Sequence, residues 1–350
     1  MKFIEVPNVG EALAYMGATL QEWGIPRDSR NGEVFVADGP VTTMYHYPTQ
    51  RVIFDPARDA NPFFHFMEGL WMIAGRNDVA WPVQFNSTFG QFSDDGETFH
   101  GAYGYRWINH FSEQIDVIEP NEEIDEIKLQ GKVWAPMNQL AHVVEMLKAN
   151  PDERRALVTM WSPEDDLGYK GKDVPCNLSI LFSISVHGKL DMTVTNRSND
   201  MIWGAYGANA VHMSMLQEYM AAWIGVPVGR YWQVSNNFHV YTKTMDKVTP
   251  TLEYQDPYLS EVKPFPMVNT DIESWGMDLS LFMEVGPVPN FQDKFFRKVA
   301  SPMWETWFTW KDASGGRTKS QRALAALDVA KNIAASDWRK ACTEWLERRV

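Results

Sequence analysis

The 350-residue chain has few cysteines, a deficit of positive charge and no long hydrophobic run. Two cysteines, Cys176 and Cys342, give no disulfide framework and are typical of a reducing compartment such as the cytoplasm. A net charge of −13 argues against a general binder of nucleic acid, although a few local arginines can still hold a small anion. No run of about 18 apolar residues occurs that would span a membrane. We therefore expect a cytoplasmic protein with no nucleic-acid partner and no membrane partner.

Two further signals are missing, a leader sequence and a metal-binding pattern. The first 17 residues carry acids early and lack the apolar core of a signal peptide. The eight histidines are scattered, and no Cys/His cluster has zinc spacing, so we predict no metal site. What the chain does have is 45% hydrophobic residues with 15 Trp and 19 Phe, which is enough for a sizeable core. Because no repeat or linker interrupts it, we expect one domain.

Hydrophobic periodicity predicts a mixture of helices and strands. Predicted helices cover residues 9–23, 62–75, 139–147, 204–224 and 318–349. Predicted strands cover residues 33–54, 154–161, 178–186, 189–195 and 231–241. Residues 89–107 are interpreted as a loop rich in glycine and aromatics, and residues 256–316 as proline-rich and irregular.

We expect the chain to be organised around Cys176. Residues 178–186 and 189–195 alternate about a His187-Gly188 turn, which predicts a β-hairpin. That hairpin would place Cys176, at the mouth of one strand, opposite Arg197 and Ser198 at the end of the next. A nearby guanidinium lowers the pKa of a thiol from about 8.5 and raises its nucleophilicity. An isolated cysteine is more often a small core residue, so the interpretation depends on its neighbours.

Other polar residues stand out in this context. Glu68 interrupts the apolar stripe of the helix at 62–75, which predicts a half-buried carboxylate with a raised pKa. Arg154 and Arg155 open a predicted strand, although a basic surface turn explains them equally well. His239 and Tyr241 share one face of the strand at 231–241.

Taken in order, these motifs resemble the thymidylate synthase and deoxypyrimidine hydroxymethylase family. The series runs Glu68, Tyr103, Arg154-Arg155, Cys176, Arg197-Ser198-x-Asp200, a glycine-led helix, then His239-x-Tyr241. The resemblance covers about residues 30–241. It implies an α+β fold, in which a mixed β-sheet is covered by helices around a long central helix. We expect a catalytic core at residues 1–255 and a C-terminal helical extension at 256–350 packed on the same domain.

The resemblance implies one-carbon transfer to C5 of a pyrimidine deoxynucleoside monophosphate, dUMP or dCMP. Cys176 resembles the nucleophile that adds to C6 and makes C5 a carbon nucleophile, which takes its one-carbon unit from 5,10-methylenetetrahydrofolate. Glu68 resembles the acid that organises water and proton transfer at the base. Tyr103 resembles the tyrosine beside the nucleophile. Asp200 completes this catalytic set and also resembles the residue that binds the pterin.

The resemblance also implies which residues hold the substrate phosphate. Arg197 and Ser198 resemble phosphate ligands, and Arg30 is a further candidate. Arg154 and Arg155 resemble the arginine pair that is donated across a homodimer interface. Several guanidinium groups on one phosphate are chemically sound, because bidentate bonds suit its geometry.

The remaining binding residues concern the ribose, the folate and the base. His239 and Tyr241 resemble ligands of the ribose 3′-hydroxyl, and Phe89 and Trp71 are candidates for the folate pocket. In the family, an Asn four residues after the helix-leading Gly reads uracil, and an Asp there reads cytosine. Counting from Gly204 gives Ala208. Either a one-residue insertion brings Asn209 to the base, or another group reads it.

Departures from the family pattern bear on the reaction. Asn177 stands where synthases usually have His, Asn199 where they usually have Gly, and Phe89 where they usually have Trp. A smaller aromatic would admit water to the exocyclic methylene intermediate, so the departures favour hydroxymethylation. The alternatives are a thymidylate synthase proper and a nucleotide-binding homologue without catalysis. A cysteine hydrolase built on Cys176 and His239 is disfavoured by the arginine cluster.

Overall fold

The computed structural model describes residues 2–29, 31–119, 128–248 and 254–350. Its centre is an eight-stranded mixed sheet with strand order β1-β4-β10-β9-β8-β7, in which β3 pairs with β10 and β2 pairs with β3. The β1–β4 and β10–β9 pairs are parallel, and the other pairs are antiparallel. The strands are β1 (Lys2–Val6), β2 (Ile25–Ser29), β3 (Gly32–Val36), β4 (Val41–Tyr45), β7 (Leu157–Thr159), β8 (Asn177–Ile184), β9 (Leu190–Asp200) and β10 (Val228–Tyr241).

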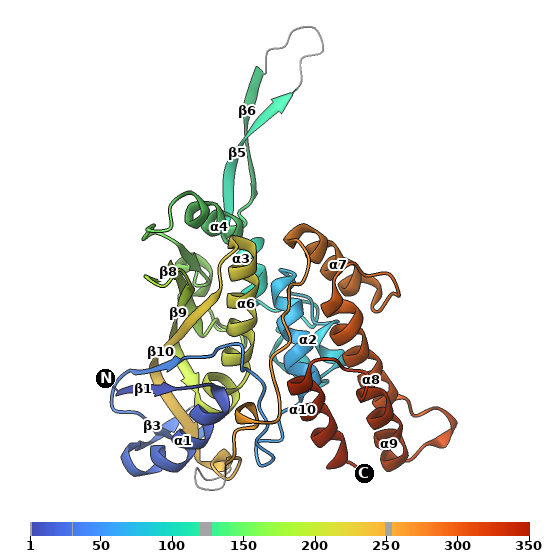
Figure 1. Ribbon diagram of the computed structural model, residues 1–350. Coiled ribbons are helices and arrows are strands. Elements are labelled where there is room, and N and C mark those ends of the chain that lie inside the picture. Colours follow the sequence, from blue (N-terminus) through green and yellow to red (C-terminus); the bar gives the residue numbers. More distant parts are fainter. Residues whose placement is uncertain (1, 30, 120–127, 249–253) are drawn as a thin grey trace.

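Helices cover the sheet in layers (Figure 1). Helix α6 lies beside the strands, α2 lies beyond α6, and α7 to α10 lie beyond α2, on the side away from the sheet (Figure 1). The helices are α1 (Val9–Trp23), α2 (Pro62–Ile73), α3 (Tyr103–Ile108), α4 (Gln139–Ala149), α5 (Pro163–Asp166), α6 (Asn209–Ile224), α7 (Ile272–Val285), α8 (Ser301–Lys311), α9 (Lys319–Ala330) and α10 (Ser336–Glu347). This arrangement confirms the α+β class, the mixed sheet and the central helix.

Helix α2 lies between the layer next to the sheet and the later helices, and it packs against those helices. Its first turn is capped by the Asn61 side chain, which accepts from two backbone N–H groups, and Pro62 fills a position that needs no donor. All twelve of its residues are buried. The rings of Trp307 and Trp345 lie 5.5 and 5.7 Å from Phe63, and Trp338 lies 5.1 Å from Phe66. The helices after residue 256 therefore share a core with α2, while the boundary at residue 255 stays a prediction.

The structure corrects several predicted segments. The irregular region 256–316 contains α7, a π-helical turn at Phe296–Ala300 and α8. Pro302 lies near the start of α8, which follows the π-helical turn directly. The loop 89–107 contains a 3₁₀ turn at Phe89–Phe92 and ends in α3. The strands at 33–54 and 154–161 shrink to β3, β4 and β7, and the helix at 318–349 is two helices.

A two-stranded hairpin, β5 (Ser112–Glu119) with β6 (Lys128–Pro136), projects from the body near α4 (Figure 1). In the described part of the chain, no helix is long and apolar enough to cross a membrane.

Candidate active site

The loop that carries Cys176 is held by Arg197 from the neighbouring strand. Cys176 directly precedes β8, and the backbone N–H of Arg197 donates to its carbonyl oxygen at 2.9 Å. The guanidinium of Arg197 donates to the carbonyl oxygens of Pro175 (2.7 Å) and Val174 (2.9 Å). The predicted hairpin therefore brings Cys176 and Arg197 together, and these bonds of the guanidinium go to the backbone of the cysteine loop.

Tyr103 supports the same loop from the other side. Its hydroxyl oxygen accepts from the backbone N–H groups of Cys176 (3.2 Å) and Asn177 (3.3 Å). Burial, followed by the nearby Cys176, raises the pKa of Tyr103, so the hydroxyl keeps its proton. Tyr103 begins α3, which lies close to α2 because residue 104 is glycine: a Cβ there would lie 1.9 Å from the carbonyl oxygen of Met72.

A polar hollow of about 480 Å³ lies on the Arg197 side of the loop. It brings together four predicted substrate ligands, which are Arg197, Ser198, His239 and Tyr241. Its lining also includes Arg27, Asp28 and Asn31, which the sequence analysis did not predict; the Asn31 amide donates to the Tyr241 hydroxyl at 3.4 Å. The predicted phosphate ligand Arg30 is outside the described residues.

An aromatic pocket of about 250 Å³ lies on the Tyr103 side of the loop. Its lining includes the predicted folate residues Trp71 and Phe89 together with Tyr103, Phe99 and Asp173. Phe89 packs against Phe99, with ring centroids 4.9 Å apart. The cysteine loop is thus bonded to Arg197 of the polar hollow and to Tyr103 of the aromatic pocket.

Glu68 is a buried acid with an unusual environment. It lies on α2 and is 8% exposed. Its pKa is raised from the ordinary 4.5 to about 8, mainly because the carboxyl group is buried and to a smaller extent because Asp173 is nearby. The Nε2 atom of His212 approaches Glu68 Oε2 to 3.5 Å, but within the described residues this oxygen accepts no hydrogen bond. Burial lowers the pKa of His212 to about 4, so the imidazole is neutral and donates to the His65 carbonyl (3.1 Å).

Asp200 ends β9 and caps the helical segment that follows. One carboxylate oxygen accepts from the N–H groups of Ile202 (3.0 Å) and Trp203 (2.6 Å). Burial raises the pKa of Asp200, and its second oxygen is buried without a hydrogen-bond partner among the described residues. Asp200 does not line the aromatic pocket, so its folate role stays a prediction. Arg58, which the sequence analysis did not consider, lies near this cap: its guanidinium is 4.0 Å from the ring centroid of Trp203, whose backbone N–H donates to Asp200.

The segment between Asp200 and α6 is irregular. Residues Met201–Ala208 are helical but have non-helical backbone angles at Tyr206 and Gly207, so counting residues from Gly204 does not fix which side chain lies nearest the cysteine loop. Asn209 follows this segment, and its amide contacts Asn177, the residue after the nucleophile, at 3.4 Å. Asn209, rather than Ala208, thus presents a polar group beside the cysteine loop. The sequence analysis noted Asn177 only as a departure from the family pattern and did not predict its contact with Asn209.

Arg154 and Arg155 lie apart from these residues. Both are exposed just before β7, the edge strand of the sheet, and the guanidinium of Arg155 pairs with Glu153 at 2.7 Å. Within one chain, neither arginine lines the polar hollow.

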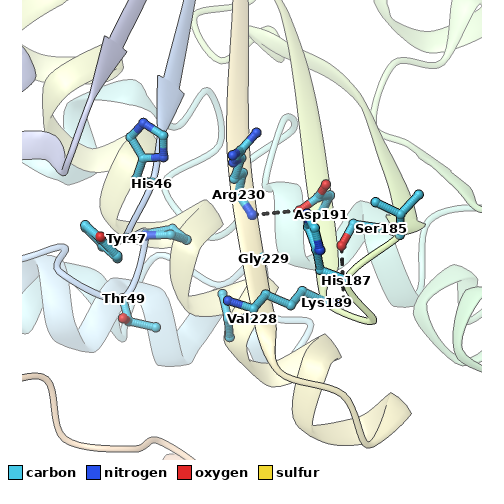
Figure 2. A pocket seen from close by; sticks show the side chains of 12 residues that line it. His46, Tyr47, Thr49, Ser185, His187, Lys189, Asp191, Val228, Gly229 and Arg230 are labelled. Atoms are coloured by element: carbon cyan, nitrogen blue, oxygen red, sulfur yellow. Dashed lines mark hydrogen bonds between the residues drawn. The ribbon is translucent and has the colours of Figure 1, made fainter.

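A third hollow, of about 430 Å³, lies at the opposite end of the strands. Figure 2 shows His46, Tyr47 and Thr49 on one side of β10 and His187, Lys189 and Asp191 on the other. It adjoins the start of β9, whereas the catalytic candidates lie at the end of that strand, roughly 20 Å away at about 3.3 Å per residue. Its lining includes the cationic groups Lys189 and Arg230 but no cysteine. Among the described residues, no cluster of three or more His, Cys, Asp or Glu could hold a metal ion.

Comparisons with known proteins agree with this arrangement. The sequence profile of the thymidylate synthase family matches residues 61–277. The chain is 46% identical to a deoxyuridylate hydroxymethyltransferase of Pseudomonas phage M6, over all of this chain and 95% of that protein. It is 39% identical to a protein of the same name from Bacillus phage SP01, over 79% of this chain and 68% of that protein. The chain therefore belongs to the thymidylate synthase family, which confirms the resemblance predicted from the sequence.

Proposed function

We propose that the protein transfers a one-carbon unit from 5,10-methylenetetrahydrofolate to C5 of dUMP and releases 5-hydroxymethyl-dUMP. The observation that carries this proposal is that the cysteine loop is hydrogen-bonded to Arg197, which lines a polar hollow, and to Tyr103, which lines an aromatic pocket. The names of the two phage relatives support dUMP as the substrate and hydroxymethylation as the outcome.

The polar hollow fits a nucleoside monophosphate. Arg27 and Arg197 supply guanidinium groups, which suit a phosphate, and Ser198 supplies a hydroxyl donor. His239 and Tyr241 lie on the same strand with ring centroids 5.5 Å apart, a placement suited to one ribose hydroxyl. In this position the base would lie toward the cysteine loop and Asn209.

The aromatic pocket fits the folate, because planar rings stack on aromatic side chains. Trp71, Phe89 and Phe99 would hold it there, and the tetrahydrofolate carrier supplies the one-carbon unit. Residues of the chain do the remaining work. The thiolate of Cys176 adds to C6 of the base, and the electron pair moves to C5 and O4. After C5 has taken the carbon, loss of the C5 proton would accompany cleavage of the bond between that carbon and the carrier nitrogen, so that tetrahydrofolate leaves and an exocyclic methylene remains on the base. Water would then add to this methylene, and the returning electron pair would expel the thiolate.

Glu68 is suited to the proton transfers. An acid whose pKa lies near 8 can give and take a proton at neutral pH, and it can accept the proton that the attacking water releases. The Tyr103 hydroxyl keeps its own hydrogen while accepting two backbone N–H bonds, so it can also donate to the reacting base.

The product distinguishes this function from methylation. Incubation with 5,10-methylenetetrahydrofolate and either dUMP or dCMP, followed by mass spectrometry of the nucleotides, is expected to give a hydroxymethyl gain on dUMP. Methylation would instead produce dihydrofolate, seen as a rise in absorbance, and a methyl gain on dUMP. A hydroxymethyl gain on dCMP alone would overturn the base assignment. No product from either nucleotide would favour a binding protein without catalysis.

We further propose that the enzyme works as a cytoplasmic homodimer in which Arg154 and Arg155 reach the phosphate of the partner subunit. Leu157, Leu181, Thr193 and Trp232 form a row across one face of the sheet, and the first two are 49% and 43% exposed. A sheet face of this composition is suited to pairing with a second copy.

Mixed subunits test this proposal. Cys176→Ala and Arg155→Ala proteins are each expected to be inactive, and together they are expected to form heterodimers with one intact site. Recovery of activity on mixing is the expected result. If mixing restores nothing while both variants form dimers by gel filtration, the shared site is contradicted.

A further inference from the structure

Asn209 is one member of a chain of hydrogen-bonded amides that continues into the core. Its Oδ1 accepts from Asn177 Nδ2 at 3.4 Å, and its Nδ2 donates to Asn199 Oδ1 at 3.0 Å. Asn199 Nδ2 in turn donates to Gln233 Oε1 (3.2 Å) and Ser235 Oγ (3.1 Å). Gln233 Nε2 then donates to the Tyr231 hydroxyl at 3.0 Å. We call these six residues the amide relay.

The relay is buried at every position except Asn209. Asn177, Asn199, Gln233, Ser235 and Tyr231 are all 2% exposed or less. An unsatisfied amide in such a place costs about 1–3 kcal/mol, so each amide keeps its partners. Both N–H groups of the Asn199 side chain donate to Gln233 and Ser235, so only its oxygen can bond to Asn209, and it does so as an acceptor. The amide of Asn209 therefore cannot turn over unless Asn199 and Gln233 turn over too.

The packing around the Asn199–Asn209 bond is consistent with a fixed geometry. The bond passes over Gly204, the first glycine of the helical lead-in. A Cβ at this position would lie 2.5 Å from Asn199 Oδ1 and 3.2 Å from Asn209 Nδ2. The absence of a side chain at residue 204 is what allows the two amides to meet.

The orientation of this amide matters because uracil and cytosine present opposite hydrogen-bond patterns. Uracil offers an N3–H donor and an O4 acceptor, whereas cytosine offers an N3 acceptor and an N4 donor. When the C6 atom of the base faces Cys176, the order of these groups along its edge is fixed. One orientation of the Asn209 amide then complements uracil, and the reversed orientation complements cytosine.

We propose that Asn199, anchored by Gln233 and Ser235, is the positioning residue that locks the Asn209 amide in the uracil-reading orientation. Asn209 meets the base, and Asn199 acts only through it. This inference rests on the proposed function, since it assumes that dUMP binds with its base beside Cys176. If the inference is correct, the choice of base depends on the buried residues behind Asn209 as well as on Asn209 itself.

The test compares dUMP with dCMP in variants that release or preserve the lock. Asn199→Ala and Gln233→Leu remove the constraint, so the ratio of kcat/KM for dUMP over dCMP is expected to fall about tenfold or more. Gln233→Glu keeps an acceptor opposite Asn199 and is expected to keep the ratio. The matched control is Asn196→Ala, which removes an equally buried asparagine of β9 whose amide donates to the Val234 carbonyl outside the relay.

Binding gives a readout that does not depend on turnover. In a Cys176→Ala background, calorimetric dissociation constants for dUMP and dCMP are expected to converge when Asn199→Ala is added. An unchanged dUMP:dCMP ratio in folded Asn199→Ala and Gln233→Leu proteins would overturn the inference, as would an equal loss in Asn196→Ala. If Asn199→Ala does not fold, Gln233→Leu decides the question. A starting protein that neither binds nor converts dUMP would contradict the proposed function itself, which is a separate outcome.

Discussion

Two polar side chains with predicted roles in the reaction, Glu68 and Asn209, have contrasting surroundings. Glu68, on α2, has a buried oxygen that accepts no hydrogen bond in the described part of the chain, and its pKa is raised to about 8. Asn209, at the start of α6, has both amide atoms bonded to neighbouring amides. A group with few partners can change its protonation state, whereas a group with many partners cannot change its orientation. Under the proposed function, we infer that Glu68 affects the rate of the reaction and that Asn209 affects the choice of base.

Replacing the proposed nucleophile is expected to have the largest effect, because without turnover neither the rate nor the base preference of the reaction can be measured. Cys176→Ala is expected to lower turnover by about 10⁴-fold or more, because no other group can form the C6 adduct. Binding of dUMP, measured by calorimetry, is expected to change only several-fold. Cys342→Ala is the matched control, since Cys342 is fully buried in α10, remote from the loop. Normal turnover in the Cys176 variant would contradict the covalent mechanism.

Glu68→Gln isolates the proton-transfer half of the comparison. The amide has the shape of the acid but cannot exchange a proton, so kcat is expected to fall about 10²- to 10³-fold. The dUMP:dCMP preference is expected to stay the same, because the amide relay is untouched. Asp337→Asn, which removes another buried acid whose pKa is raised, to about 6, is the control. A changed base preference in Glu68→Gln would break the proposed division of roles.

Glu68→Gln is also expected to change how the free energy of unfolding depends on pH. Above pH 4.5 the unfolded chain releases the Glu68 proton, while the folded protein holds it up to about pH 8. Rising pH between these values therefore favours the unfolded state, by roughly 1.4 kcal/mol per pH unit. Glu68→Gln lacks this loss, so its free energy of unfolding relative to the parent is expected to rise from pH 5 to pH 8. Urea titrations at several pH values measure it, and a constant difference would show that Glu68 is ionised.

The smallest expected effect concerns the support of the loop. Tyr103→Phe keeps the ring but leaves the N–H groups of Cys176 and Asn177 without their acceptor. Each lost bond is worth about 0.5–1.5 kcal/mol, so kcat is expected to fall about tenfold. Tyr258→Phe, which removes a buried hydroxyl bonded to Asp337, serves as the control and is expected to keep its activity. Equal losses in both variants would indicate a general effect of destabilisation.

Local patterns predicted the parts of the fold in which neighbours in sequence are neighbours in space. The hairpin of β8 and β9, helix α1 and the cap of α2 follow from alternation, periodicity and Asn61-Pro62. The helices α7 and α8 were missed because their stability comes from aromatic contacts with distant residues, such as Trp307 with Phe63. Sequence periodicity does not encode such contacts.

The site shows the same limit. The order of motifs predicted Cys176, Glu68 and Tyr103 as site residues, and the structure brings four predicted nucleotide ligands, Arg197, Ser198, His239 and Tyr241, into one hollow. The predicted ligands Asn209, Arg154 and Arg155 do not line it, and Arg30 is outside the described residues. The kink at Tyr206 and Gly207 before Asn209 was not predicted, so the count from Gly204 assumed a regular helix there. The amide relay joins Asn199 to Gln233 across 34 residues, a contact that no local sequence pattern predicts.

The most direct test of the account is to run the reaction with dUMP and 5,10-methylenetetrahydrofolate in water enriched in heavy oxygen. Mass spectrometry of the product then shows where the added oxygen comes from. The account predicts a hydroxymethyl group that carries the heavy isotope, because water adds to the exocyclic methylene. A methyl product without added oxygen, together with dihydrofolate, would contradict it.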